Sequence, residues 1–137
     1  METYAGTGLV RYEFNDFAFL GQESLRAAEA ATCADEQGSF WQYHDTIFLN
    51  QRGENGGAFA DENLRTFAAA IGLDEGDFNT CLGSNRHRNE INDGIVEARD
   101  FGVQSTPSFR INGELVEGLV SFEQFQAIID QELSAVQ

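Results

Sequence analysis

The sequence contains no lysine, a single proline and only two cysteines. Cys33 and Cys81 lie far apart in the chain, so no Cys-x-x-Cys redox motif is present. Together with His44 and His87 they do not make a spaced zinc motif either, and we expect neither a metal nor a cofactor. No apolar run approaches the roughly 20 residues that a membrane span needs, so we also expect no membrane span.

Negative charge dominates what is present. The 137 residues carry a formal net charge of −15, and all the basic residues are arginine. Such a surface repels nucleic acid and anionic membranes, which excludes both as partners. The charge fits either a protein that binds basic partners or adaptation to high salt, where self-repulsion is screened within a few Å. We favour a halophilic protein.

Hydrophobic spacing and turn residues predict one strand, a run of helices, a hairpin and a last helix. Asn112-Gly113 is a strong hairpin signal, and Ser121 with Gln124 predicts a capping box. The order indicates an α/β or α+β domain with an inserted helical block. We predict a strand at 9–14, helices at 22–37, 39–49, 61–72, 74–82 and 84–101, hairpin strands at 107–111 and 114–116, and a helix after 121.

The residues alone leave three interpretations of Cys33 and Cys81: a catalytic pair, two free buried thiols or a structural disulfide. A catalytic cysteine needs a lowered pKa. Asp35 and Glu36 would raise the pKa of Cys33, and Cys81 lies at the end of a predicted helix, where the dipole is unfavourable. We therefore assign no catalytic residue. His44, on an aromatic face, is expected at the core boundary, and His87 is expected to balance local charge.

Three separated stretches resemble the DsbA-like thiol–disulfide oxidoreductases of the thioredoxin superfamily. Residues 30–45 are similar to the inserted helical domain of that family, residues 102–109 to its cis-proline loop, and Ile111-Asn112-Gly113 with Gly118 to its terminal hairpin. The resemblance implies a thioredoxin-like α/β fold. Residues 1–137 would form a single domain, with an inserted helical block at about 22–101 and thioredoxin core segments at 1–21 and 102–137.

The resemblance also implies a site. The Thr106–Pro107 peptide bond would be cis, and Ser105, Thr106 and Pro107 would contact an extended polypeptide substrate or a redox partner protein. An ordinary trans proline opening an edge strand is the alternative. In the family the helices that here carry Cys33 and Cys81 are neighbours, which favours a structural disulfide.

This chain differs from the family at its beginning, and the difference determines which activity we expect. The family's first strand and its Cys-x-x-Cys helix precede the strand expected here at 9–14, so we expect both to be absent from this chain. That strand must then pair with the hairpin, borrow a strand from another chain or stay partly unpaired.

Three hypotheses of function follow. The first is a thiol–disulfide oxidoreductase domain that is inactive as given, and the second is a redox-inactive module that binds peptides or a partner. The third is a small-molecule enzyme without cysteines, for which no polar constellation is found. The family suggests work outside the cytoplasm, where disulfides persist, although the first residues do not read as a signal peptide. Substrate, redox direction and oligomeric state stay open.

Overall fold

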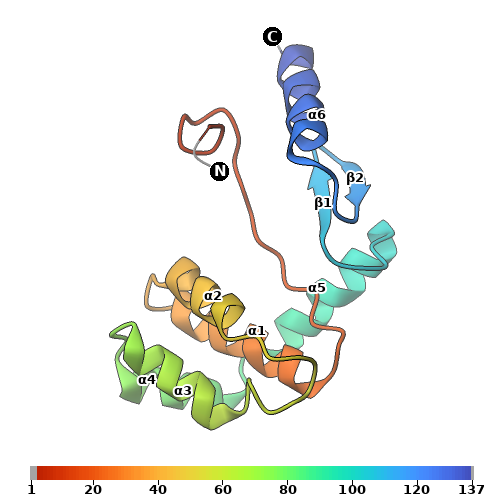
Figure 1. Ribbon diagram of the computed structural model, residues 1–137. Helices are drawn as coiled ribbons and strands as arrows, with labels where there is room; N and C mark the ends of the chain where they lie inside the picture. Colours follow the sequence, from red (N-terminus) through yellow and green to blue (C-terminus); the bar gives the residue numbers. More distant parts are fainter. Residues whose placement is uncertain (1–2, 137) are drawn as a thin grey trace. The chain divides into compact units, whose positions relative to one another are not determined.

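A computed structural model describes residues 3–136 (Figure 1). In that part of the chain six helices precede or follow a single hairpin. The elements in chain order are α1 (Gln22–Asp35), α2 (Phe40–Leu49), α3 (Asp61–Ala70), α4 (Glu75–Ser84), α5 (Arg88–Phe101), β1 (Ser108–Ile111), β2 (Glu114–Glu117) and α6 (Phe122–Ala135). None of the helices among these residues is both long and apolar enough to cross a membrane.

The chain forms two compact units. The helical unit runs from Asp16 to Val96, and the hairpin unit combines the residues up to Asn15 with those from Glu97 onward. Helix α5 therefore begins in one unit and ends in the other.

The core of the helical unit is built around α1, which packs against α2, α3 and α4. Alanines at 27, 30, 31 and 34 leave room for the larger side chains of the neighbouring helices, including Tyr43, Leu64, Phe78 and Leu82. The hydroxyl of Tyr43 donates a hydrogen bond to the Leu64 carbonyl oxygen at 2.8 Å, so its buried polar atom is satisfied. Burial raises the pKa of Tyr43.

Two turn residues set the helix ends in this unit. Gly72, with φ +79°, follows α3 and confirms the expected stop. The helix predicted from residue 84 begins only at Arg88, because Asn85 adopts a left-handed conformation with φ 54°. Arg26 fixes that turn by donating a hydrogen bond to the Asn85 side-chain oxygen at 2.7 Å. Sequence spacing does not reveal such a long-range contact.

The hairpin unit confirms the expected turn and cap. Strands β1 and β2 pair antiparallel with Phe109 opposite Val116, and both residues of the Asn112-Gly113 turn have positive φ. The Ser121–Gln124 capping box opens α6. The rings of Phe109 and Phe125, 4.8 Å apart, pack α6 against the hairpin.

The strand predicted at 9–14 is wrong. These residues form no strand, and the sheet of the described residues contains only β1 and β2. Among residues 3–136 this segment does not pair with the hairpin, and the N–H groups of Leu9 and Val10 instead donate hydrogen bonds to the Tyr4 carbonyl oxygen at 3.0 Å and 3.3 Å. Most of its residues are exposed, whereas Val10 and Phe14 are half-buried.

Candidate functional site

The expected substrate turn lies immediately before β1. The Thr106–Pro107 bond is cis, as predicted. Ser105 and Thr106 are exposed, whereas Pro107 is half-buried. Two hydrogen bonds hold the turn in place: the Gly118 N–H donates to the Pro107 carbonyl oxygen at 2.8 Å, and the Ser108 hydroxyl donates to the Ser105 carbonyl oxygen at 2.6 Å.

The backbone N–H and carbonyl groups of Thr106 are available for hydrogen bonds to another molecule. Among residues 3–136 it neither donates to nor accepts from another part of the chain. Within the same range, the β1 edge opposite β2 carries no strand. A free strand edge is a template for an incoming extended peptide.

Cys33 and Cys81 are joined by a disulfide with a Cα–Cα distance of 5.8 Å, which confirms that they lie within bridging distance. The bond connects α1 to α4. The two residues are 2% and 1% exposed, respectively. A protein thiol cannot approach such sulfurs while the helices stay packed, which argues against a catalytic pair.

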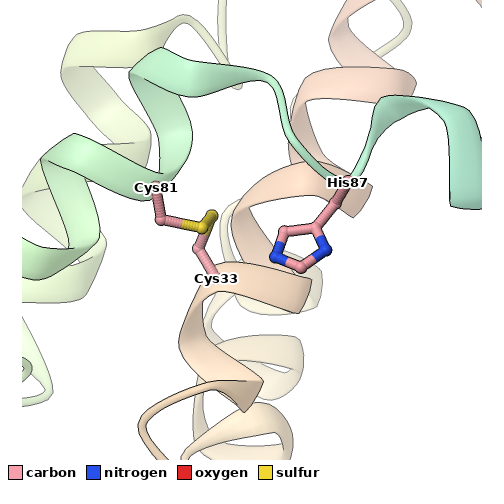
Figure 2. A group of neighbouring side chains, drawn as sticks. All are labelled: Cys33, Cys81 and His87. Atoms are coloured by element: carbon pink, nitrogen blue, oxygen red, sulfur yellow. A yellow bond between two sulfur atoms is a disulfide. The ribbon is translucent and has the colours of Figure 1, made fainter.

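His87 lies beside this disulfide, a proximity that the sequence did not reveal (Figure 2). One ring nitrogen and the two sulfurs all lie within 4.8 Å of one another. The Nε2 atom is 2.7 Å from a carboxylate oxygen of Glu36, which also pairs with Arg86. Arg86 first, and then His87, hold the pKa of Glu36 below its usual value. His87 thus lies in a cluster of charged side chains with Glu36 and Arg86.

His44 occupies a different environment. Its ring packs between those of Phe40 and Phe48, with centroids 5.9 Å and 4.5 Å away, and its Nδ1 lies 3.0 Å from an Asp45 oxygen. It is partly covered at the boundary of the aromatic cluster, as the sequence suggested. In the described residues it does not join the cluster formed by His87 and the two cysteines.

Glu29 is the buried charged residue of the helical unit. Arg26 donates to it at 2.7 Å, and Arg88 donates twice, at 2.9 Å and 3.0 Å. Arg26 also forms a bidentate pair with Asp61, with both distances below 3 Å, and Asp61 has a lowered pKa for that reason. This network ties α1 to α3 and α5. In the sequence, the only signal of this network is the i,i+3 spacing of Arg26 and Glu29, which favours an ion pair on one helix.

A cis-proline turn leading into a hairpin, followed by a capped helix and preceded by a helical unit, defines a DsbA-like protein of thioredoxin fold. The chain belongs to the thioredoxin family, whose model matches residues 1–131. The thiol-disulfide exchange protein α-DsbA2 of Wolbachia pipientis superposes with a TM-score of 0.76 at 30% identity, over 92% of this chain and 67% of that one. A thioredoxin-like oxidoreductase from Silicibacter pomeroyi gives 0.68 at 25% identity, over 86% of this chain and 65% of that one.

Two kinds of curated relatives are similar in sequence. A probable disulfide bond formation protein D of Bacillus anthracis is 28% identical over 136 residues, which cover 96% of this chain and 62% of that protein. A Na⁺/H⁺ antiporter NhaA 1 of Salinispora arenicola is 31% identical over 103 residues, which cover 75% of this chain and 15% of that protein. The chain thus spans less than two thirds of the length of these relatives. The expected thioredoxin-like fold is confirmed.

Proposed function

We propose that this chain receives an extended polypeptide at the turn formed by Ser105, Thr106 and Pro107, as part of a protein thiol–disulfide oxidoreductase. The observation that carries the proposal is the exposed Thr106 backbone, which has no internal hydrogen bond and stands at the start of the open β1 edge. A visiting strand would pair with that backbone and continue along the edge. The named activities of the Wolbachia and Bacillus relatives support the same class of substrate.

We further propose that the 137-residue chain does not itself exchange disulfides. Exchange requires an accessible thiolate, whereas both cysteines of this sequence are bonded to each other and buried. The reactive Cys-x-x-Cys pair of the family would have to be supplied from outside these residues. The alternative is a redox-inactive module that binds peptides or a partner through the same turn, which the burial of both cysteines equally favours.

Binding at the turn is tested with carboxymethylated insulin B chain, an extended polypeptide whose thiols are blocked. Thr106→Arg places a bulky side chain at the turn and should weaken binding by about tenfold, because one or two backbone hydrogen bonds are lost. Thr66→Arg, at an exposed position on α3, adds the same charge and should leave binding unchanged. Equal effects of the two substitutions, or no binding by the unaltered chain, would refute the proposed site.

Redox activity is tested separately by insulin reduction. The chain should show no turnover above the background of the reductant. Turnover that disappears in Cys33→Ser would show instead that the buried pair is catalytic. A Cys-x-x-Cys encoded in frame upstream of Met1 would favour the oxidoreductase, and its absence the redox-inactive binding module.

A further inference from the structure

The cluster of Cys33, Cys81 and His87 combines two sulfur ligands and one imidazole from three different segments of the chain. Cys33 lies on α1, Cys81 on α4, and His87 in the turn before α5. We propose that reduction of the disulfide converts this cluster into a site for one Zn²⁺ ion. The proposal concerns the helical unit and does not depend on peptide binding at Thr106.

The donor set matches the chemistry of zinc. Thiolate and imidazole are its common protein ligands, at about 2.3 Å and 2.0–2.1 Å, in tetrahedral geometry. Ligand atoms on such an ion are separated by less than the 4.8 Å that spans the present cluster. The Cα atoms of the cysteines, 5.8 Å apart, are held by packed helices. Rotation of the two freed side chains is therefore the main adjustment required.

The reaction balances with a dithiol as reductant. The dithiol transfers two electrons and two protons to the Cys33–Cys81 bond, which breaks to give two thiols, and the dithiol becomes a disulfide. Binding of Zn²⁺ then displaces both thiol protons to solvent, because thiolates are the ligands. The ion ends with two sulfur ligands, one imidazole nitrogen and one remaining position.

Two carboxylates lie beside the His87 ring, where they could orient the imidazole or supply a fourth zinc ligand. Glu36 is 2.7 Å from Nε2 of His87, and Glu90 is 3.4 Å from Nδ1. Whichever nitrogen faces the metal, the other has a carboxylate partner, and such partners orient metal-bound histidines. A Glu36 oxygen or a water fills the fourth position. Arg86 already pairs with Glu36 and would remain at the rim.

A surface pocket lies next to the cluster of Cys33, Cys81 and His87. It has a volume of about 220 Å³ and is lined by Glu36, Gln37, Asp77, Thr80 and Arg86. Its lining includes Glu36, the hydrogen-bond partner of His87, and Thr80, the neighbour of Cys81 in the sequence. Two carboxylates at this opening would draw a cation toward the buried sulfurs.

Zn²⁺ binding by the reduced chain is measured in competition with a chromogenic chelator, after reduction with a phosphine that is then removed. We expect one Zn²⁺ per chain in the reduced protein and none in the disulfide form. Co²⁺ in place of Zn²⁺ should show sulfur-to-metal charge-transfer absorption. The double variant Cys33→Ser/Cys81→Ser should lose both signals.

The role of His87 separates this site from simple capture of metal by two thiols. His87→Ala should weaken Zn²⁺ binding by at least roughly 10- to 100-fold, the loss seen when only an outer partner of a ligand is removed. His44→Ala is the matched control and should bind like the unaltered chain. Zn²⁺ binding that is equally tight in His87→Ala, or absent from the reduced chain, would overturn the proposal.

The test remains decisive if reduction unfolds the helical unit. Zn²⁺ should then restore the helical circular dichroism of the reduced chain and of His44→Ala, but not that of His87→Ala, because metal binding and folding are coupled. Recovery in all three proteins would exclude His87 as a ligand, and recovery in none would exclude the site.

Discussion

At the scale of single residues, Glu29 is the most tightly constrained charge in the helical unit. Its side chain is 2% exposed and pairs with Arg26 and Arg88. A buried ion pair adds little net stability when complete, but removing one partner leaves the other charges poorly solvated. The network therefore positions helices more than it stabilises them.

Replacing Glu29 should be costly. Glu29→Ala is expected to lower the free energy of unfolding by about 3 kcal/mol, at the low end of the range because both arginines retain some contact with water. Urea unfolding followed by circular dichroism measures the change. Glu54→Ala, at an exposed loop position, should change it by less than about 0.5 kcal/mol. Similar effects of the two substitutions would mean that the network contributes nothing specific.

Asp61 makes stability depend on acidity. Because Arg26 lowers its pKa in the folded state, its stabilising effect is complete above the unfolded pKa of about 4 and is lost as pH falls through the folded pKa. Asp61→Asn should thus be less stable than the unaltered chain at pH 7, with a difference that shrinks toward pH 2. Urea titrations at several pH values measure it.

Asp93→Asn is the matched control for that titration. Asp93 is exposed on α5 and has no ion-pair partner among the described residues. Its substitution removes the same charge from an exposed position without breaking an ion pair, so it should alter the free energy of unfolding at pH 7 by less than about 0.5 kcal/mol. A difference for Asp61→Asn that stays constant from pH 7 to pH 2 would contradict the assigned pKa shift.

At the scale of elements, the Cys33–Cys81 bond clips α1 to α4 across 48 residues of sequence. Closing a loop of this length in the unfolded chain stabilises the folded state by about 4 kcal/mol in the chain-entropy model. Reduction in the presence of a metal chelator should lower the free energy of unfolding by about that amount. The reductant should have no effect on Cys33→Ser/Cys81→Ser, and an equal effect on both proteins would show that it acts elsewhere.

At the scale of the whole molecule, a charge of −15 on 137 residues opposes compaction. Between 0.1 M and 1 M salt the screening length falls from about 10 Å to about 3 Å. The thermal midpoint should rise by about 5 °C or more over this interval, equivalent to roughly 1.5 kcal/mol for a chain of this size. Thermal scans at increasing NaCl concentration measure it.

A charge-reduced variant is the control for the salt effect. Four exposed carboxylates without partners among the described residues are changed to glutamine, which removes four negative charges. They are Glu54, Glu97, Glu114 and Glu123. The midpoint of this variant should rise less steeply with salt. A flat midpoint for the unaltered chain would mean that its acidic residues serve another purpose, such as binding a basic partner.

Local patterns in the sequence were sufficient for most elements of this protein. The Asn112-Gly113 turn, the Ser121 cap and the stop at Gly72 depend on residues close in the chain, so short-range chemistry specifies them. The helices follow from hydrophobic spacing, and the cis bond at Pro107 from a resemblance carried by neighbouring residues.

Features that depend on distant residues were decided only by the tertiary structure. The segment 9–14 has the composition of a strand, but a strand needs a partner, and none pairs with it in the described part of the chain. Asn85 ends α4 in a left-handed conformation, and a hydrogen bond donated by Arg26 holds its side chain there. His87 reached the Cys33–Cys81 bond because α1 and α4 pack together, and no spacing along the chain encodes that distance.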